Sequence, residues 1–211
     1  RPPAIVAEPI PDVPFQDGCG LSHAVAMKEA GGAKLSAGKI SCPMAGALAM
    51  WLEHEVQPAA EEILKSKVTS VRHMGTYACR NIVGVKGLKR FRSQHASANA
   101  IDISAFVLSD GSTVSLSKHW RQEGPQSQFL HRIHRGPGNY FRVAVSPDFN
   151  EAPHDHFQLD RGAFLVPVHY HPDQSHMALG GFRKAGFALV AEPEAAAMGL
   201  KGRGDTRRER I

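Results

Sequence analysis

The stretch SQHASANAIDISAFVL, residues 93–108, passes from a polar loop into a predicted β-strand. Its apolar residues alternate, imperfectly, from Ile101 to Leu108, which is the pattern of a strand. An Asp-Gly turn follows at 110–111, so we expect STVSLS at 112–117 to return as the partner strand of a hairpin. His95 and Asp102 lie seven positions apart, and the small, uncharged or aliphatic residues between them let the backbone approach an ion closely.

A second polar stretch, HDHFQLD at 154–160, supplies two more histidines. In a strand, His154 and His156 point to one face, and Phe157 and Leu159 point to the other face, toward the core. A hydrolytic zinc site uses three protein ligands and one water. One histidine of this pair, with the histidine and aspartate of the first stretch, would supply that set. The other histidine would then lie beside the water as a general base or would stabilise an oxyanion. The alternative from spacing alone is two unrelated polar turns.

The remaining segments indicate the fold class. Ser41, Cys42 and Pro43 begin the clearest helix, which we expect Pro58 to interrupt. SQFLHRIHR at 127–135 has the spacing of another helix. Strand candidates are KVTSVRHM at 67–74, YFRVAVS at 140–146 and HFQLD at 156–160. A few helices followed by several antiparallel strands predict an α+β domain, with a small antiparallel sheet that carries a zinc site and is flanked by helices.

We expect three parts along the chain. Residues 1–17 contain five prolines and are interpreted as an extended linker. Residues 18–162 form the domain. Residues 163–211 form a C-terminal extension that ends in the basic tail KGRGDTRRERI. The chain opens on Arg1, so we expect a processed or truncated product from which an export signal or anchor has been removed.

Composition narrows the class of protein. A hydrophobic fraction of 42% and a charged fraction of 21% fit a soluble globular core, and no run of 18 apolar residues is present. The formal net charge is +5, and part of that excess lies in the basic tail. No fingerprint of a nucleic-acid-binding motif is present, so we expect no nucleic-acid partner. The tail and the removed N-terminal segment would favour proximity to a membrane or a cell wall.

Three cysteines leave the pairing open. Cys19 and Cys42 flank a glycine-rich segment and could close a disulfide loop, as suits an exported protein. Three reduced thiols are the alternative. Cys79 is the third cysteine, and no CxxC pair is present, which argues against a cysteine-based zinc site.

The two polar stretches carry a resemblance. SxHxxAxAxD at 93–102 resembles the SxHxxGxAxD signature of zinc D-Ala-D-Ala carboxypeptidases and dipeptidases, and HDHFQL at 154–159 resembles the HxHF strand of lysostaphin-type endopeptidases. Both groups belong to a superfamily that includes the hedgehog signalling domain. Together with CGLSHAV, CPMAGALAMWL and TYACR, these motifs are similar to the bacterial extensin-like C-terminal domain family over residues 18–162.

The resemblance implies a role for each matching position. It implies that zinc, Zn²⁺, is bound by His95, Asp102 and His156, and that His154 acts next to the catalytic water. It also implies three substrate-contacting candidates. Arg80 would bind a peptide carboxylate, Ser93 would support its loop or touch substrate, and His134 matches a histidine common in the family.

Three positions depart from the family pattern. Ala98 replaces a glycine, which matters only if this backbone needs a positive φ. Gln158 stands where relatives often have a third histidine, which favours His154 and His156 as the working pair. A family cysteine near Asn139 is absent, and this absence would leave Cys79 free.

These features predict an exported zinc metallopeptidase of the periplasm or cell envelope. It would hydrolyse an amide bond in peptidoglycan stem peptides or their cross-links. The choice between an endopeptidase and a D,D- or L,D-carboxypeptidase stays open, and the endopeptidase is favoured. The alternative is a zinc-stabilised module that binds peptidoglycan or protein without turnover, as the hedgehog relatives illustrate.

Overall fold

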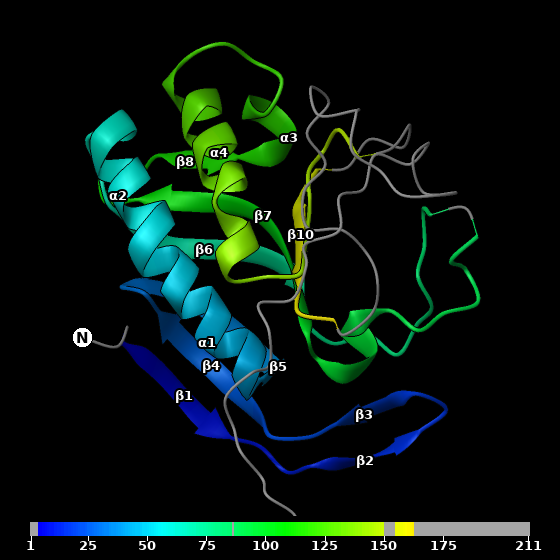
Figure 1. Cartoon of the computed structure of the whole chain (residues 1–211). Coiled ribbons are helices and arrows are strands. Elements are labelled where there is room, and N and C mark those ends of the chain that lie inside the picture. Colours follow the sequence, from blue (N-terminus) through cyan, green and yellow to red (C-terminus); the bar gives the residue numbers. More distant parts are fainter. Residues whose placement is uncertain (1–3, 86, 150–154, 163–211) are drawn as a thin grey trace, which may run out of the picture.

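The structure is a computed structural model that describes residues 4–85, 87–149 and 155–162. Its main feature is an eight-stranded sheet with helices packed on one face (Figure 1). The strand order is β1-β4-β5-β6-β7-β10-β9, and β8 pairs with β7 beside this path. All pairs are antiparallel except β5 with β6. The α+β class is therefore confirmed, but the sheet is larger than predicted and mixed.

The strands of the main sheet are β1 (Ile5–Pro9), β4 (Ala24–Ala30), β5 (Ala33–Ser41), β6 (Val68–Gly75), β7 (Ala100–Leu108), β8 (Thr113–Ser115), β9 (Val143–Val145) and β10 (Phe157–Asp160). A separate hairpin consists of β2 (Val13–Gln16) and β3 (Cys19–Leu21). The predicted hairpin of β7 with the segment after the Asp-Gly turn is confirmed by the pairing of β7 with β8.

Strand β7 has a bulge that explains its imperfect alternation. Arg72 and His73 of β6 are consecutive, but they pair with Ala105 and Ile103 of β7, so Ser104 is an extra residue. The bulge shifts the phase of the side chains by one position. For this reason the core receives Ile101 and Ile103 before the bulge and Phe106 and Leu108 after it.

A continuous helical run covers the sheet. It comprises α1 (Cys42–Trp51), η1 (Leu52–Val56), α2 (Gln57–Ala59) and η2 (Ala60–Leu64). Ser41 caps the start, because its hydroxyl accepts the Met44 amide at 3.4 Å. The expected interruption at Pro58 is wrong. The two flanking segments are π-helical, and such wider turns absorb the hydrogen bond that a proline cannot donate.

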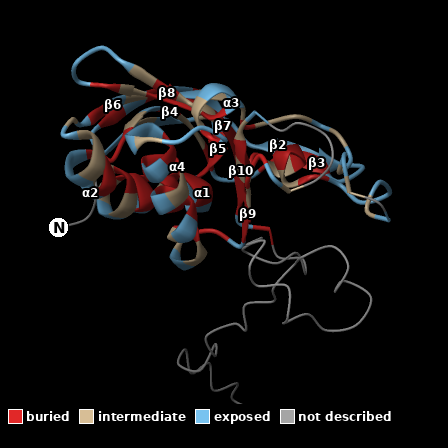
Figure 2. Cartoon of the chain, turned by 90° about the horizontal axis from the view of Figure 1, so that it is seen from above, coloured by how far each residue is buried: buried red, intermediate tan, exposed pale blue. Residues whose placement is uncertain are grey.

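The remaining helices are α3 (Leu116–His119), α4 (Pro125–Arg135) and two short 3₁₀ turns, η3 (Gln94–Ser97) and η4 (Pro137–Asn139). Helix α4 confirms the predicted helix at 127–135. It packs beside α1 and α2 on the same face of the sheet (Figure 1), and the buried residues lie between these layers (Figure 2). Edge-to-face aromatic pairs join the layers, including Trp51 with Phe141 and Phe106 with Phe129.

The N-terminal segment differs from the prediction. Residues 5–9 of the expected linker form β1, the edge strand beside β4, and residues 13–16 form β2. Edge strands tolerate proline because one of their sides makes no ladder hydrogen bonds. The expected C-terminal extension, residues 163–211, lies outside the described residues. Among the described helices, none combines the length and the apolar character needed to cross a membrane.

The disulfide joins Cys19 of β3 to Cys79, which follows β6. Both sequence-based expectations about pairing are therefore wrong: Cys42 is not paired with Cys19, and Cys79 is not free. Cys42 is an exposed free thiol at the start of α1. The pairing depends on a contact between segments 60 residues apart, which cysteine spacing cannot show.

Removing this disulfide is expected to lower the free energy of unfolding by about 4 kcal/mol, because the crosslink closes a loop of 60 residues in the unfolded chain. The variant is Cys19→Ser with Cys79→Ser, and the measurement is urea unfolding under non-reducing conditions. Cys42→Ser is the matched control and should leave stability within about 0.5 kcal/mol of the original. A thiol reagent should titrate one free thiol per native chain, and none in Cys42→Ser. Loss of stability in the control alone would contradict this pairing.

Candidate functional site

The loop that carries His95 is built around a single 3₁₀ turn. The Ser93 hydroxyl accepts the His95 amide at 3.3 Å and caps the turn. Ala98 ends the turn with φ +55°, in the left-handed region where glycine is favoured. The replacement of the family glycine by Ala98 was expected to matter only if the backbone had a positive φ here, and it does. Ala98 adopts this conformation and is fully buried. The turn thus buries the His95 side chain beside the start of β7.

The structure brings the three predicted zinc ligands together. His95 Nε2 lies 3.2 Å from Asp102 Oδ1, and His156 Nε2 lies 3.7 Å from the same oxygen. The register of β7 with β10 accounts for the second contact. Asp102 pairs with Gln158, so His156 lies diagonally across from the aspartate on the same face of the sheet. Phe157 points to the opposite face and is fully buried, as the alternation predicted.

A neighbouring carboxylate orients one imidazole. His156 Nδ1 lies 3.0 Å from Asp155 Oδ1, and the carboxylate can accept a hydrogen bond from it, while Nε2 is the ring nitrogen nearest Asp102. An outer carboxylate that fixes the tautomer in this way is the usual support of a metal-binding histidine. Sequence reasoning missed Asp155, although its position directly before the second histidine of HDH was a signal.

The donor set suits zinc in its chemistry, and two distances within it are close to those between zinc ligands. Two imidazole nitrogens and one carboxylate are common zinc ligands, and a tetrahedral ion with bonds near 2.1 Å keeps its ligand atoms about 3.4 Å apart. The two contacts to Asp102 Oδ1 bracket that value. In the part of the chain that is described, however, no group of three His, Cys, Asp or Glu side chains is arranged so that it could hold a metal ion. Zinc binding therefore stays a prediction.

Arg80 belongs to this cluster. Its Nη2 lies 3.9 Å from Asp102 Oδ2, the oxygen that the histidines do not face, and 34% of its side chain is exposed. The disulfide at Cys79 fixes the preceding residue, and the Arg80 carbonyl accepts the Ser93 amide at 3.0 Å. A half-exposed guanidinium at the edge of the cluster can contact both Asp102 and an incoming carboxylate.

The other predicted site residues have different positions. Ser93 is buried, and its hydroxyl caps the turn of its own loop. Of the two expected roles, support of the loop or contact with substrate, this geometry fits the first. His134 on α4 is buried too; its ring stacks on Phe157 at 5.2 Å and meets Trp120 edge to face at 5.6 Å. It therefore packs behind the strand that follows His156. His154 lies outside the described residues.

Asp160 is a buried acid near the cluster that sequence reasoning missed. It pairs with Ala100 at the start of β7, and its Oδ1 accepts the Gly162 amide at 3.0 Å. Burial raises the pKa of Asp160 to about 6, against the lowering effects of that hydrogen bond and of the nearby His95. The signal was available, because residues 156, 158 and 160 alternate onto the site face of β10.

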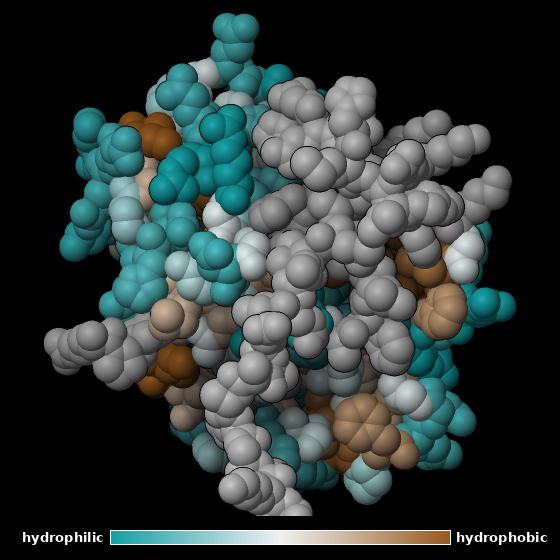
Figure 3. All heavy atoms as spheres, in the orientation of Figure 1, coloured by the Kyte–Doolittle hydropathy of each residue, from teal (hydrophilic) through white to brown (hydrophobic). Residues whose placement is uncertain are grey.

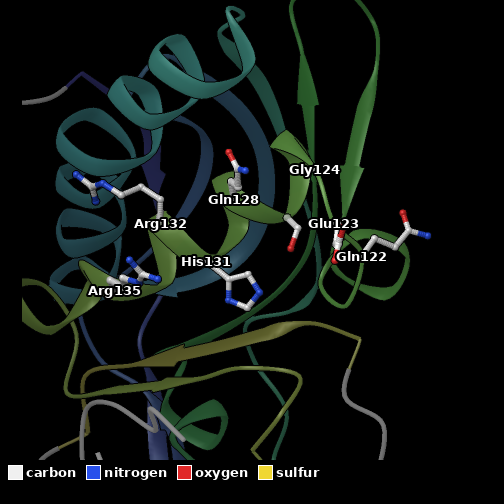
Figure 4. A pocket seen from close by; sticks show the side chains of 8 residues that line it. Gln122, Glu123, Gly124, Gln128, His131, Arg132 and Arg135 are labelled. Carbon is white, nitrogen blue, oxygen red and sulfur yellow. The ribbon is translucent and has the colours of Figure 1, made fainter. Parts of the chain in front are cut away.

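A hollow of about 580 Å³ lies elsewhere, along α4 and the loop before it (Figure 4). Its lining contains none of the predicted site residues. Two of the side chains that line it already have partners: the His131 ring lies 3.9 Å from the Trp120 ring in a tilted arrangement, and Arg132 pairs with Glu55 at 2.9 Å. The hollow is thus distinct from the histidine–aspartate cluster.

Comparison with known proteins gives one match. The family model described as extensin-like protein C-terminus matches residues 3–166, which include the sheet, the loop with His95 and the strand after His156. No curated protein and no solved structure is significantly similar to the chain.

Asp160 is expected to make stability depend on pH in the metal-free, chelator-treated protein. Its folded pKa of about 6 exceeds the ordinary 3.8, so its contribution is fully present below pH 3.8 and is lost as the pH rises through 6. The loss should be about 3 kcal/mol in the free energy of unfolding. Urea unfolding across this range should show the decline in the original protein and its absence in Asp160→Asn. Parallel curves for the two proteins would contradict the assignment.

Proposed function

The chain belongs to the extensin-like protein C-terminus family, and from that premise we propose that it is a zinc-dependent peptidase acting on peptidoglycan peptides. The observation that carries the proposal is the convergence of two imidazole nitrogens, from His95 and His156, on one oxygen of Asp102. His95 comes from the loop with the 3₁₀ turn, Asp102 comes from β7, and His156 directly precedes β10. Side chains brought together from three segments in this way favour a built site over chance polar turns.

His95, Asp102 and His156 would hold the ion, and Asp155 would keep the His156 tautomer that leaves Nε2 available. When bound, zinc supplies Lewis-acid chemistry, polarising a carbonyl and lowering the pKa of a water molecule. His154 belongs to the same proposal as the acid–base group, on the basis of the sequence motif alone.

The chain's own contribution to substrate binding would come from Arg80. Its side chain is partly exposed, and its guanidinium lies 3.9 Å from Asp102 Oδ2, the oxygen that the histidines do not face. It would bind a carboxylate of the stem peptide and orient the neighbouring amide bond. Because stem peptides carry side-chain as well as terminal carboxylates, an arginine here serves an endopeptidase or a carboxypeptidase, and we favour the endopeptidase.

Localisation in the periplasm or cell envelope completes the proposal. The disulfide between Cys19 and Cys79 is compatible with an exported protein, because such bonds persist in oxidising compartments.

Zinc content tests the ligand set. The protein should bind about one zinc ion per chain, and His156→Ala should abolish stoichiometric binding. Asp155→Ala should weaken zinc affinity by 10-fold or more, because the outer carboxylate no longer orients the ring. The readouts are elemental analysis and competition with a chromogenic chelator. His131→Ala, a histidine of α4 outside the cluster, is the matched control and should keep full zinc. Equal zinc content in all four proteins would exclude this ligand set.

Digestion of purified sacculi tests the reaction. His154→Ala should retain zinc and lose turnover by about 100-fold or more, as expected for loss of an acid–base group. Arg80→Ala should chiefly raise KM for substrates with a free carboxylate, and Arg80→Lys should recover only part of the loss because lysine lacks the bidentate fork.

Separation of the muropeptides by chromatography distinguishes the outcomes. Dimers converted to monomers would identify an endopeptidase, and shortened stems would identify a carboxypeptidase. Unchanged muropeptides from a zinc-loaded protein would refute the peptidase and indicate the non-catalytic binding module instead.

A further inference from the structure

A loop beside the cluster has both of its ends in the candidate site. We call it the rim loop, residues 81–85 and 87–92. It starts directly after Arg80 and ends directly before Ser93, which caps the turn of His95. Its base is closed by hydrogen bonds from the Ser93 amide to the Arg80 carbonyl at 3.0 Å and from the Ile82 amide to the Phe91 carbonyl at 2.9 Å. From this base it projects away from the sheet (Figure 1).

The rim loop is held against the β2–β3 hairpin by a hydrogen bond and by the nearby disulfide. Arg92 donates through Nε to the Asp17 carbonyl at 2.6 Å and through Nη1 to Asn81 Oδ1 at 2.8 Å. Gly18 allows this approach, because a Cβ there would lie 2.9 Å from the Arg92 side chain. The disulfide between β3 and Cys79 ties the same two segments together. The hairpin and the rim loop thus form one lobe beside the sheet.

This lobe exposes large apolar side chains. Val83 is 67% exposed and Phe91 47% on the rim loop, and Phe15 is 58% exposed and Val13 44% on β2. Brown, hydrophobic surface appears at this side of the molecule in Figure 3. Water-exposed phenylalanine and valine on a projecting loop cost free energy unless something covers them.

The charge of the rim loop points to an anionic partner. Its sequence contains Lys89, Arg90 and Arg92 and no acidic residue. Lys89 and Arg90 are exposed, and the Arg90 guanidinium lies 5.1 Å above the Phe91 ring. Directly before the hairpin, the Asp12 carboxylate accepts the His23 amide. The acidic residue within the hairpin is the exposed Asp17, against three cations on the rim loop. Cations set beside an exposed aromatic ring on a protruding loop match a phospholipid surface, where apolar groups enter the headgroup region and cations meet phosphates.

We propose that the rim loop and the β2–β3 hairpin bind the surface of a membrane that contains anionic phospholipids. The inference does not depend on zinc or on hydrolysis. Because the rim loop lies between Arg80 and Ser93, docking through it would hold the histidine–aspartate cluster close to the membrane surface. A protruding loop suits a broad surface better than it suits an extended peptide, which needs a groove.

Vesicle binding of the full chain tests the charged component. The chain should co-sediment with vesicles of phosphatidylglycerol and phosphatidylcholine, and much less with phosphatidylcholine alone. Lys89→Gln with Arg90→Gln should weaken binding about 25-fold, at about fivefold for each cation. Lys118→Gln with Arg135→Gln is the matched control, because both residues are exposed cations on other elements. The same loss in both double variants would overturn the proposal.

Insertion of the apolar side chains is tested by fluorescence. The native Trp51 and Trp120 are buried, so a new tryptophan on the surface can be followed against them. Val83→Trp should be quenched by lipids brominated in the acyl chain, whereas Met74→Trp, at a residue 55% exposed on β6, should not. Thermal melting of each variant shows that the fold is kept.

Two results would contradict membrane docking. The first is equal quenching, or its absence, at both tryptophans. The second concerns poly-glutamate, which serves as a model of an acidic peptide. If the double variant Lys89→Gln with Arg90→Gln lost binding to poly-glutamate but kept binding to vesicles, the partner of the lobe would be an acidic peptide.

Discussion

The pairing of β10 with β7 is the constraint on which the candidate site depends. Phe157 opposes Ile103 and Leu159 opposes Ile101, so four buried apolar side chains fix the register from the core side. The same register places His156 diagonally across from Asp102 on the other face. A slip of one residue would send His156 into the core and Phe157 to the site face. The hydrophobic core therefore selects the geometry of the polar cluster.

Strand β7 serves the core and the cluster at once because of its bulge. Before Ser104, its core-facing residues are Ile101 and Ile103, and Asp102 is free to face the histidines. After the bulge, the phase is shifted and Phe106 points into the core against Trp51 and Phe129.

Because Asp102, His95 and Asp160 are buried, their interactions are weakly screened by water, and burial raises the pKa of Asp160.

The disulfide is the second long-range constraint. It joins β3 to the residue before Arg80, and Arg92 reaches across the same interface to the Asp17 carbonyl. One crosslink therefore holds the β2–β3 hairpin, the base of the rim loop and the guanidinium that faces Asp102. The cluster lies where this lobe meets the main sheet, so its polar residues come from segments that share no secondary structure.

The sequence by itself determined the α+β class, the strands that carry the two motifs, helix α4 and the family, because these follow from local periodicity and short motifs. It also selected His95, Asp102 and His156, which the structure brings together. It was wrong on the N-terminal segment, where β1 pairs with β4, and on Pro58, which π-helical turns accommodate. Only the tertiary structure decided the partner of Cys79, the place of Arg80 beside Asp102 and the burial of Asp160. Each of these depends on which distant segments share a surface, and that is fixed by packing of the whole core rather than by spacing along the chain.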